Sequence, residues 1–372
     1  MNTSSDFVSV KAYGKIVLFG AYSVLEPGNI GMVLQVNHGS TACVRVAFEK
    51  DLEIDLPNFD IFTSGHFVDD KLRLLKDRAE LVFVKNSIEY VYAYLKIVKI
   101  PWKKIKVTCK TDNELINEKV KTGFGSSATA VVSVVSAILK FHGIDDKFLA
   151  YKISRYSHYK SQGKLGSGID CAAAVFGGGF FINSEKKLNS FRDYVFSDIL
   201  CPIEQFDMPV GLLPVFIFTG KSASTKQYIQ KLLKFKNNFP KKYYDHMTQY
   251  NEVNKRLRKA FLLGTISEIE KLLQESWAFR DLLCKSADFD VVPNKIRFLI
   301  NKFLENGAWV AGLHGAGGGD SIVAFCLNEK EKKRLIDFAE ENDLLVLKNL
   351  TILNSIFEFK IGSEHSKAQQ QL

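Results

Sequence analysis

The feature that most constrains this chain is a glycine- and serine-rich segment, KTGFGSSAT at residues 121–129, followed at once by an apolar helical pattern. Apolar residues recur on a broad face over 131–139, and Gly143 follows as a stop signal. Glycines let the backbone approach an anion closely, and the first amides of a helix carry partial positive charge. The segment therefore predicts a phosphate-binding loop at the start of a buried helix.

The same letters also match Gly-x-Gly-x-x-Ala, the dinucleotide-binding fingerprint. That fingerprint leaves a buried strand by a tight turn, whereas here the nearest strand-like run, 105–109, is followed by the polar stretch 110–121. The P-loop pattern Gly-x-x-x-x-Gly-Lys-Ser/Thr does not occur in the sequence. A glycine turn that only caps a core helix remains an alternative when this segment is taken alone.

Composition limits the class of protein. The 372 residues, 46% hydrophobic with 29 Phe, suffice for two domains with sizeable cores. The net charge is +9, but lysines alternate with acidic residues, as in 328–334, which is typical of solvated helix faces and argues against nucleic-acid binding. No apolar run is long enough for a membrane span. Six dispersed cysteines without metal-ligand spacing indicate reduced thiols and a cytoplasmic location.

Hydrophobic periodicity separates strands from helices along the chain and so favours an α+β fold. Strands are predicted at 15–19, 31–37, 41–48, 105–109, 180–183, 210–218, 321–327 and 355–361. Helices are predicted at 87–95, after the phosphate loop, and at 147–158, 243–273, 295–304 and 330–341. We expect one domain over 1–201, a second over 202–362, and a polar, disordered tail over 363–372.

Four further segments carry a family resemblance. They are KAYGKIVLFGAYSVLEPG at 11–28, GSGIDCAAA at 166–174, TGKSAST at 219–225 and HGAGGGDS at 314–321. Together with the loop at 121–129, and in this order, they resemble the GHMP kinases, most closely the phosphomevalonate kinases, from about residue 8 to 362. The resemblance implies a ribosomal protein S5 domain 2-like N-terminal domain and a ferredoxin-like C-terminal domain. It also implies ATP-dependent phosphorylation of (R)-5-phosphomevalonate to the diphosphate, in the mevalonate pathway of isoprenoid biosynthesis.

The resemblance assigns roles to residues. ATP is expected to contact Lys121, Gly123, Gly125, Ser126, Ser127 and Ala128. The Ser127 hydroxyl is the candidate Mg²⁺ ligand, since Mg²⁺ prefers hard oxygen donors. Lys15 and Asp170 are the candidate catalytic pair. A phosphate acceptor is already mostly anionic at neutral pH, so Asp170 acts either as a general base or by orienting Lys15.

The acceptor needs a cradle of its own. It is expected to contact Tyr22, Ser167, Lys221, Ser222, Ser224, His314, Gly317 and Gly318. The sequence departs from the family pattern at three positions: Tyr13 replaces a usual proline, Gly312 a usual lysine and His314 a serine. These departures bear on which substrate is bound more than on the fold.

Other functions remain open at this stage. Mevalonate kinase or diphosphomevalonate decarboxylase would use the same fold, although Ala21-Tyr22 replaces the glutamate-histidine of the former and Gly125 the alanine of the latter. A catalytically silent ligand sensor is the third hypothesis, against which the retained Lys15, Ser127 and Asp170 argue. The expected partners are ATP and phosphomevalonate, with no nucleic acid and no membrane. A homodimer is compatible with the sequence but not required by it.

Overall fold

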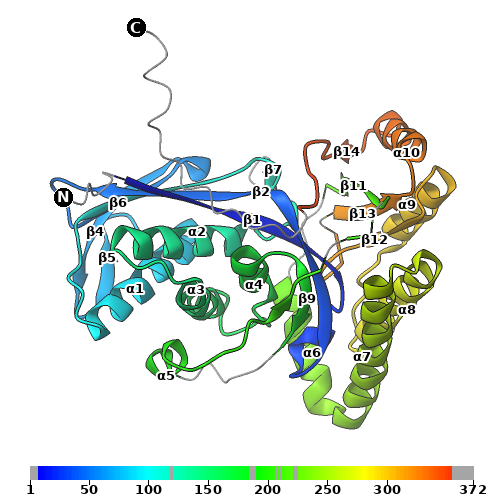
Figure 1. Cartoon of the computed structure of the whole chain (residues 1–372), viewed down its shortest axis with the longest axis horizontal. Helices are drawn as coiled ribbons and strands as arrows, with labels where there is room; N and C mark the ends of the chain where they lie inside the picture. Colours follow the sequence, from blue (N-terminus) through cyan, green and yellow to red (C-terminus); the bar gives the residue numbers. More distant parts are fainter. Residues whose placement is uncertain are drawn as a thin grey trace, which may run out of the picture.

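The computed structural model describes residues 7–117, 120–183, 190–206, 208–209, 211–220, 225–319 and 321–353. Two units lie side by side, each a sheet with helices packed on it (Figure 1). The predicted strand 355–361, the polar tail 363–372 and the predicted acceptor residues Lys221, Ser222 and Ser224 lie outside the described residues.

The first sheet is built around two long antiparallel strands, β1 (Phe7–Phe19) and β2 (Ile30–Val46). The strand order is β10-β9-β2-β6-β3-β4-β5, with β1 also paired to β2. Only the β3–β6 pair among the described pairs is parallel. The remaining strands are β3 (Leu52–Leu56), β4 (Ile61–Val68), β5 (Lys71–Leu74), β6 (Ile105–Thr111), β9 (Gly179–Ile182) and β10 (Ile203–Glu204).

Helices cover one face of this sheet (Figure 1). They are α1 (Val82–Ile97), α2 (Ser126–Phe141), α3 (Lys147–Ser161), α4 (Ile169–Phe176) and the short α5 (Phe191–Val195). The α2 helix packs against both long strands and against α1, α3 and α4, so it is buried almost all round. This explains its nearly uninterrupted apolar sequence, because a helix surrounded by other elements has no face left for charged residues.

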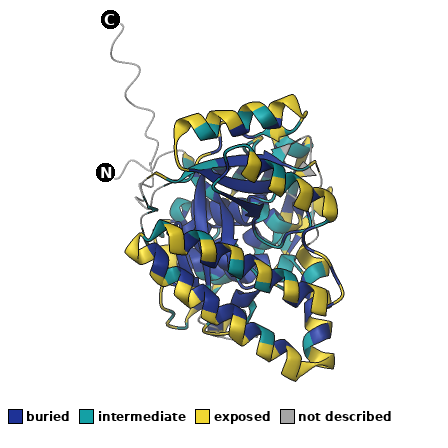
Figure 2. Ribbon diagram, turned by 90° about the vertical axis from the view of Figure 1, so that its right-hand side faces the viewer, coloured by how far each residue is buried: buried dark blue, intermediate teal, exposed yellow. Residues whose placement is uncertain are grey.

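The second unit has an antiparallel sheet of order β12-β13-β11-β14. Its strands are β11 (Leu213–Phe218), β12 (Val310–Leu313), β13 (Ser321–Cys326) and β14 (Leu345–Val346). Its helices are α6 (Thr225–Asn238), α7 (Pro240–Leu263), α8 (Ile266–Ser286), α9 (Asn294–Glu305) and α10 (Glu329–Glu341). The α7 and α8 helices pair with each other and show the alternation of buried and exposed stripes expected of amphipathic surface helices (Figure 2).

The two units share a hydrophobic core. Phe19 and Phe124 of the first unit pack with Phe216 and Val323 of the second. The Trp277 side chain of α8 reaches the first unit, where its Nε1 donates to the Leu18 carbonyl oxygen at 2.9 Å. The second unit therefore packs directly against the phosphate loop and the end of β1, so the contact between the units helps to position the residues of the site.

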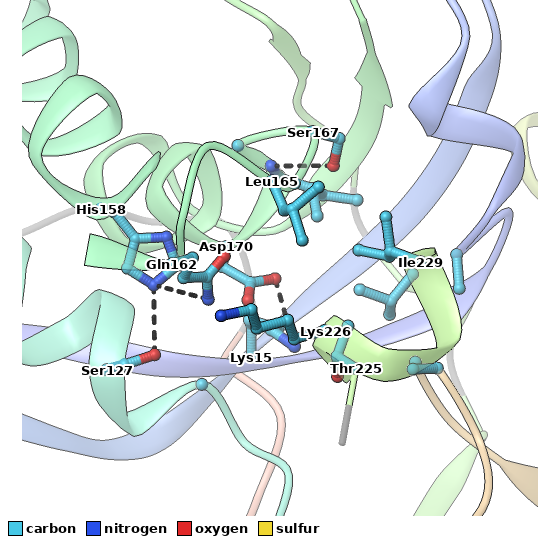
Figure 3. A pocket seen from close by; sticks show the side chains of 18 of the residues that line it. Lys15, Ser127, His158, Gln162, Leu165, Ser167, Asp170, Thr225, Lys226 and Ile229 are labelled. Atoms are coloured by element: carbon cyan, nitrogen blue, oxygen red, sulfur yellow. Dashed lines mark hydrogen bonds and ion pairs between the residues drawn. The ribbon is translucent and has the colours of Figure 1, made fainter. Parts of the chain in front are cut away.

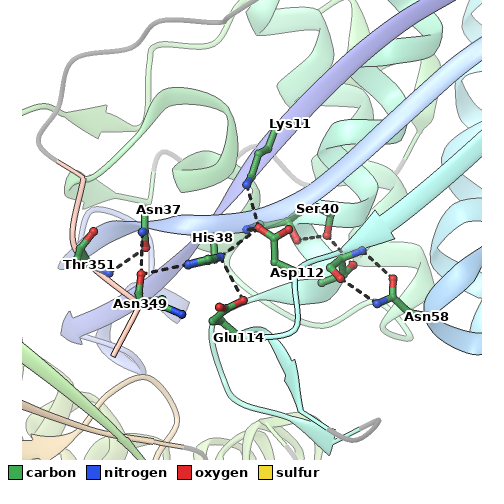
Figure 4. A network of polar contacts seen from close by, with 12 residues as sticks. Lys11, Asn37, His38, Ser40, Asn58, Asp112, Glu114, Asn349 and Thr351 are labelled. Carbon is green, nitrogen blue, oxygen red and sulfur yellow. Dashed lines mark hydrogen bonds and ion pairs between the residues drawn. The ribbon is translucent and has the colours of Figure 1, made fainter. Parts of the chain in front are cut away.

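A polar network adds a second connection between the units (Figure 4). His38 of β2 places Nδ1 3.4 Å from Asp112 and 3.2 Å from Glu114, and its Nε2 lies 3.1 Å from the Asn349 carbonyl oxygen. Lys11 pairs with the same Asp112 at 2.9 Å. The network joins β1, β2 and the segment after β14 to the loop that leads into the short hairpin β7 (Ile116–Asn117) and β8 (Val120–Lys121).

The structure corrects two predicted elements. The helix predicted over 243–273 is two helices, because Gly264 adopts the left-handed conformation (φ 69°) and ends α7. The strands predicted at 31–37 and 41–48 are one strand, β2, whose pairing with β1 changes register between Tyr13 and Lys15. The sequence patterns did not predict β3 to β5, β10, the short strands β7, β8 and β14, or the helices α4, α5 and α6.

The domain boundary predicted between 201 and 202 falls just before β10, which pairs with β9 of the first sheet. The second sheet begins with β11. Three short 3₁₀ helices complete the inventory of the described residues: η1 (Ser23–Leu25), η2 (Pro57–Phe59) and η3 (Ala79–Leu81).

Candidate active site

A cavity of about 340 Å³ lies where the two units meet. Side chains from β1, α2, α3, α4 and α6 line it, together with Gly315 and Ala316 after β12 (Figure 3). Its size is in the range of small-molecule sites. The cavity collects residues from most of the sequence segments that carried the family resemblance.

The N-terminal ends of three helices open into this cavity. Ser126 and Ser127 of α2, Ile169 and Asp170 of α4, and Thr225 of α6 all line it. The residues before α2 and α4 are glycines, Gly125 and Gly168, which have no side chain to cap the helix, although the Ser167 hydroxyl accepts from the Ile169 N–H at 3.4 Å. Uncapped helix N-termini direct amide donors and partial positive charge at the space in front of them, so the cavity favours an anionic ligand.

The glycines before α2 and α4 are required by geometry. Gly125 and Gly168 both have φ of +83°, where residues with a Cβ are strained. A Cβ on Gly125 would lie 3.2 Å from Cε of Lys15, and one on Gly168 would lie 2.1 Å from Nη1 of Arg155. The two glycines therefore admit a lysine and an arginine next to the two helix ends.

Basic side chains dominate the charge of the cavity wall. Among the described residues, Lys15, Lys121, Arg155 and Lys226 line it, against one carboxylate, that of Asp170. The Arg155 guanidinium is buried and donates to the Ser167 carbonyl oxygen, which fixes the loop before α4. This excess of positive charge suits a ligand that carries several phosphate groups.

Lys15 and Asp170 form an ion pair inside the cavity, with Nζ 3.3 Å from Oδ1. Lys15 lies on β1, where its backbone N–H donates to the Phe124 carbonyl oxygen of the phosphate loop at 2.9 Å. Its side chain is 9% exposed and that of Asp170 is 29% exposed. The two candidate catalytic residues are therefore brought together, and the backbone of Lys15 is tied to the phosphate loop.

The sequence analysis missed a polar contact on the same wall. The Ser127 hydroxyl lies 3.1 Å from Nε2 of His158, and Gln162 Nε2 lies 3.3 Å from the same nitrogen. Burial lowers the pKa of His158 to about 4, against the opposing effect of Asp170 and with a smaller contribution from Lys121 and Lys15, so the imidazole is neutral at pH 7. The predicted helix 147–158 contained His158, but a histidine in a helix pattern gives no sign of such a contact.

The predicted acceptor residues divide into two groups. Ser167 and Tyr22 line the cavity, and the Tyr22 hydroxyl donates to the Ala316 carbonyl oxygen at 2.7 Å. Burial raises the pKa of Tyr22 well above its usual value, so the phenol stays protonated. Both residues therefore line the cavity, and their contact with the acceptor stays a prediction.

Gly315 and Ala316 line the cavity, whereas the neighbouring His314, Gly317 and Gly318 do not. Gly317 packs on Val291 and Gly318 on Tyr228, each too close for a Cβ. His314 is 3% exposed, and its ring contacts Phe124 at 5.1 Å between centroids. Their contact with substrate stays a prediction, as does that of Ala128, which is buried in α2 beneath the loop.

Gly312, one of the departures from the family pattern, has a structural reason. A Cβ at this position would lie 2.6 Å from Cζ3 of the Trp277 ring. The indole occupies the space that a lysine side chain would need to leave the strand. Glycine at position 312 therefore leaves room for the Trp277 ring at the junction of the two units.

Family models match both units of the chain. The GHMP kinases N terminal domain model covers residues 83–178, and the GHMP kinases C terminal model covers residues 257–343. The chain belongs to the GHMP kinases. Both the family and the two-domain fold expected from the sequence motifs are confirmed.

Individual proteins and solved structures are similar to this GHMP kinase over most of its length. A phosphomevalonate kinase of Saccharolobus solfataricus is 29% identical over 321 residues, which are 85% of this chain and 90% of the relative. Among solved structures, the Lin0012 protein of Listeria innocua superposes with a TM-score of 0.82 at 23% identity, over 93% of this chain and 99% of that one. A Streptococcus pneumoniae phosphomevalonate kinase, solved with phosphomevalonate and AMPPNP, gives 0.75 at 20% identity, over 93% and 100%. At these identities the two structures support the fold alone.

Proposed function

We propose that this GHMP kinase is an ATP-dependent phosphomevalonate kinase, which transfers the γ-phosphoryl group of ATP to the phosphate of (R)-5-phosphomevalonate. The observation that carries the proposal is the Lys15–Asp170 ion pair in a cationic cavity beside the uncapped start of α2. The similarity to phosphomevalonate kinases over most of the chain supports the choice of acceptor. The products are ADP and 5-diphosphomevalonate, an intermediate of the mevalonate pathway.

The nucleotide phosphates would bind at the start of α2. Gly123, Gly125, Ser126 and Ser127 line the cavity there, with Lys121 beside them. Phosphoryl transfer is catalysed mainly by positioning and by stabilising charge, so amide donors and a lysine at this point supply what the donor substrate needs.

The acceptor phosphate would enter from the side of α4 and α6. One of its oxygens forms a bond to the γ-phosphorus while the bond from that phosphorus to the β,γ-bridging oxygen breaks, and ADP leaves with the electron pair. At neutral pH the attacking oxygen carries no proton that must be removed, since the second pKa of a phosphate monoester is about 6. Lys15 then stabilises the negative charge that gathers between donor and acceptor, and Asp170 holds the ammonium group in place.

The donor set at the cavity suits Mg²⁺. Ser127 and Asp170 both present oxygen atoms to the same cavity, and oxygen is the ligand Mg²⁺ prefers. No group of three or more His, Cys, Asp or Glu side chains in the described part of the chain could hold a metal by itself, which suits an ion held partly by nucleotide phosphates. When bound, Mg²⁺ would neutralise phosphate charge. Ser127, with Asp170 nearby, would hold it.

An acceptor panel tests the function. The purified chain is given ATP and Mg²⁺ with mevalonate, 5-phosphomevalonate or 5-diphosphomevalonate, and ADP release is followed. We expect turnover with 5-phosphomevalonate alone. ADP release only with another of the three would contradict the proposal and make the chain a different GHMP enzyme, and silence with all three despite ATP binding would favour the ligand sensor.

Other expectations stay predictions. No helix among the described residues has the length and hydrophobicity needed to cross a membrane. The cytoplasmic location, the lack of nucleic-acid binding and the open question of a homodimer rest on sequence composition alone.

A further inference from the structure

His158 contacts a residue that the proposed function uses, and no role has yet been given to it. It lies on α3, is 5% exposed, and lines the cavity opposite the start of α2. Figure 3 shows its Nε2 facing the Ser127 hydroxyl and the Gln162 amide. The contact determines which atoms of the Ser127 hydroxyl face the cavity.

The partners of Nε2 indicate which ring nitrogen carries the proton. A neutral imidazole has one donor and one acceptor nitrogen. Both neighbours of Nε2, the Ser127 hydroxyl and the Gln162 amide nitrogen, have hydrogens to donate. This arrangement is satisfied when Nε2 is the acceptor and Nδ1 carries the proton, an assignment inferred from the hydrogen-bond network.

The tautomer decides what Ser127 can offer to a ligand. A serine hydroxyl has one hydrogen and two lone pairs. If the hydrogen points to His158, only lone pairs remain for the cavity. Such an oxygen is a good ligand for a cation and a poor donor to a phosphate oxygen.

We propose that His158 is a positioning residue that accepts the Ser127 hydroxyl proton in a hydrogen bond and thereby presents the serine lone pairs to the divalent cation that accompanies ATP. The inference rests on the proposed kinase function for the presence of a metal–nucleotide complex. It does not depend on which acceptor is phosphorylated.

Gln162 supports the same arrangement. It lies one helical turn after His158, and its Oε1 is 3.2 Å from the point where a Cβ on Gly166 would lie. The side chain therefore spans from the imidazole to the loop that precedes α4 and Asp170. Its amide approaches Nε2 from the side of the cavity, which keeps that nitrogen in the acceptor role.

The test separates metal binding from nucleotide binding. The variants are His158→Phe, which keeps a ring but cannot accept the bond, and Ser127→Ala, alone and combined. Affinity for ATP is measured calorimetrically with and without Mg²⁺, and Mn²⁺ binding to the protein–ADP complex is followed by electron paramagnetic resonance. Neither readout requires turnover.

We expect His158→Phe to weaken Mn²⁺ binding to the protein–ADP complex roughly tenfold, the effect of losing one oriented hydrogen bond to a charged site. Affinity for metal-free ATP should stay within about twofold of the wild type. Ser127→Ala should behave alike, and the double variant should be no worse than Ser127→Ala alone, because both changes remove one interaction. His158→Gln, whose Oε1 can accept a hydrogen bond, should recover part of the loss.

A matched control is His142→Phe. His142 is also a buried histidine of the first unit, 8% exposed, but it lies at the end of α2 far from the phosphate loop and bonds the Ile138 carbonyl oxygen. His142→Phe should bind Mn²⁺ in the protein–ADP complex as tightly as the wild type does. If His158→Phe does not fold, His158→Met replaces it, since Met is of similar size and accepts weakly.

Two results would overturn the inference. One is an equal loss of affinity for ATP with and without metal, which would indicate a general structural role. The other is additivity of His158→Phe and Ser127→Ala, which would show that they act separately. The two proposals can fail separately. If 5-phosphomevalonate is not turned over but the variants change Mn²⁺ binding as expected, the proposed substrate is rejected and the role of His158 stands.

Discussion

Nζ of Lys15 lies 3.3 Å from Oδ1 of Asp170, which joins the strand that opens the first sheet to the first turn of α4. Lys15 is also bound through its backbone to the phosphate loop. One residue is thus tied both to the loop expected to hold ATP and to the carboxylate beside the expected acceptor.

Replacing either member of the pair should remove charge stabilisation during transfer. For Lys15→Met and Asp170→Asn we expect kcat to fall by about 10² or more, the usual cost of losing a preorganised charged group at a reacting phosphate. The Kd for ATP should change little, because the nucleotide is held at the start of α2. Single-turnover kinetics and equilibrium ATP binding measure the two effects separately. Near-normal kcat in either variant would show that the pair is not at the reacting centre.

Gly125 and Gly143 offer a matched pair for testing the phosphate loop. Both have positive φ, +83° and +82°, so alanine at either position should cost about 1 kcal/mol of stability through backbone strain. A Cβ at Gly125 also meets Lys15 at 3.2 Å, whereas at Gly143 nothing lies within 4 Å. We therefore expect a similar loss of unfolding free energy in both variants but a loss of kcat only in Gly125→Ala. Equal activity in the two variants would contradict the close approach of Lys15 to the loop.

The buried His314 should make stability depend on pH. Burial lowers its pKa to about 3, with Lys15 and Arg280 adding repulsion, from the ordinary value of 6.5. Between these two values the unfolded chain binds a proton that the folded chain does not, so stability falls as pH falls from 6.5 towards 3 and is unaffected above 6.5.

Replacing this histidine should flatten the profile. Between pH 6.5 and 5 the wild type should lose about 1.5 kcal/mol more unfolding free energy than His314→Phe. Urea unfolding at the two pH values measures this difference, with the exposed His66→Gln as a control. Identical pH profiles for wild type and His314→Phe would mean that His314 is hydrated or paired.

Gly312 and Trp277 should be coupled energetically. Gly312→Ala brings a Cβ to 2.6 Å from the indole ring and should cost about 1–3 kcal/mol. In a Trp277→Leu background the same change should cost much less, since the obstructing ring is gone. A double-mutant cycle from denaturant unfolding gives the coupling energy. Additive effects would show that the indole does not fill this position.

Much of the site follows from local sequence. The glycines and serines at 123–127 need a particular backbone conformation, and the pattern that follows them predicts the buried helix directly. Lys15 and Asp170 were found through the family motifs around them, and the structure brings them to ion-pair distance. These residues can be predicted from the sequence because each lies in a short motif whose residue types are restricted.

Other features depend on contacts that no local pattern reveals. His158 faces Ser127 only because α3 packs beside α2, and His314 is buried against Phe124 while its neighbours Gly315 and Ala316 line the cavity. The strand β2 continues through Asn37 and Gly39, residue types common in turns, because β1 pairs with it on both sides, at Gln35 and at Gly39, and β6 pairs with it from Ser40 onwards. In each of these features, contacts between elements distant in the sequence determine the structure, and the local residue types do not.

The central claim is that this chain joins a second phosphate to 5-phosphomevalonate. Phosphorus NMR of the reaction with ATP and Mg²⁺ tests it directly, because a phosphoanhydride gives a pair of coupled resonances where the monoester gives one. We predict that the 5-phosphomevalonate signal is replaced by such a pair in step with the appearance of ADP. Formation of ADP with the monoester signal unchanged, or transfer to a hydroxyl group giving a second monoester signal, would contradict the account.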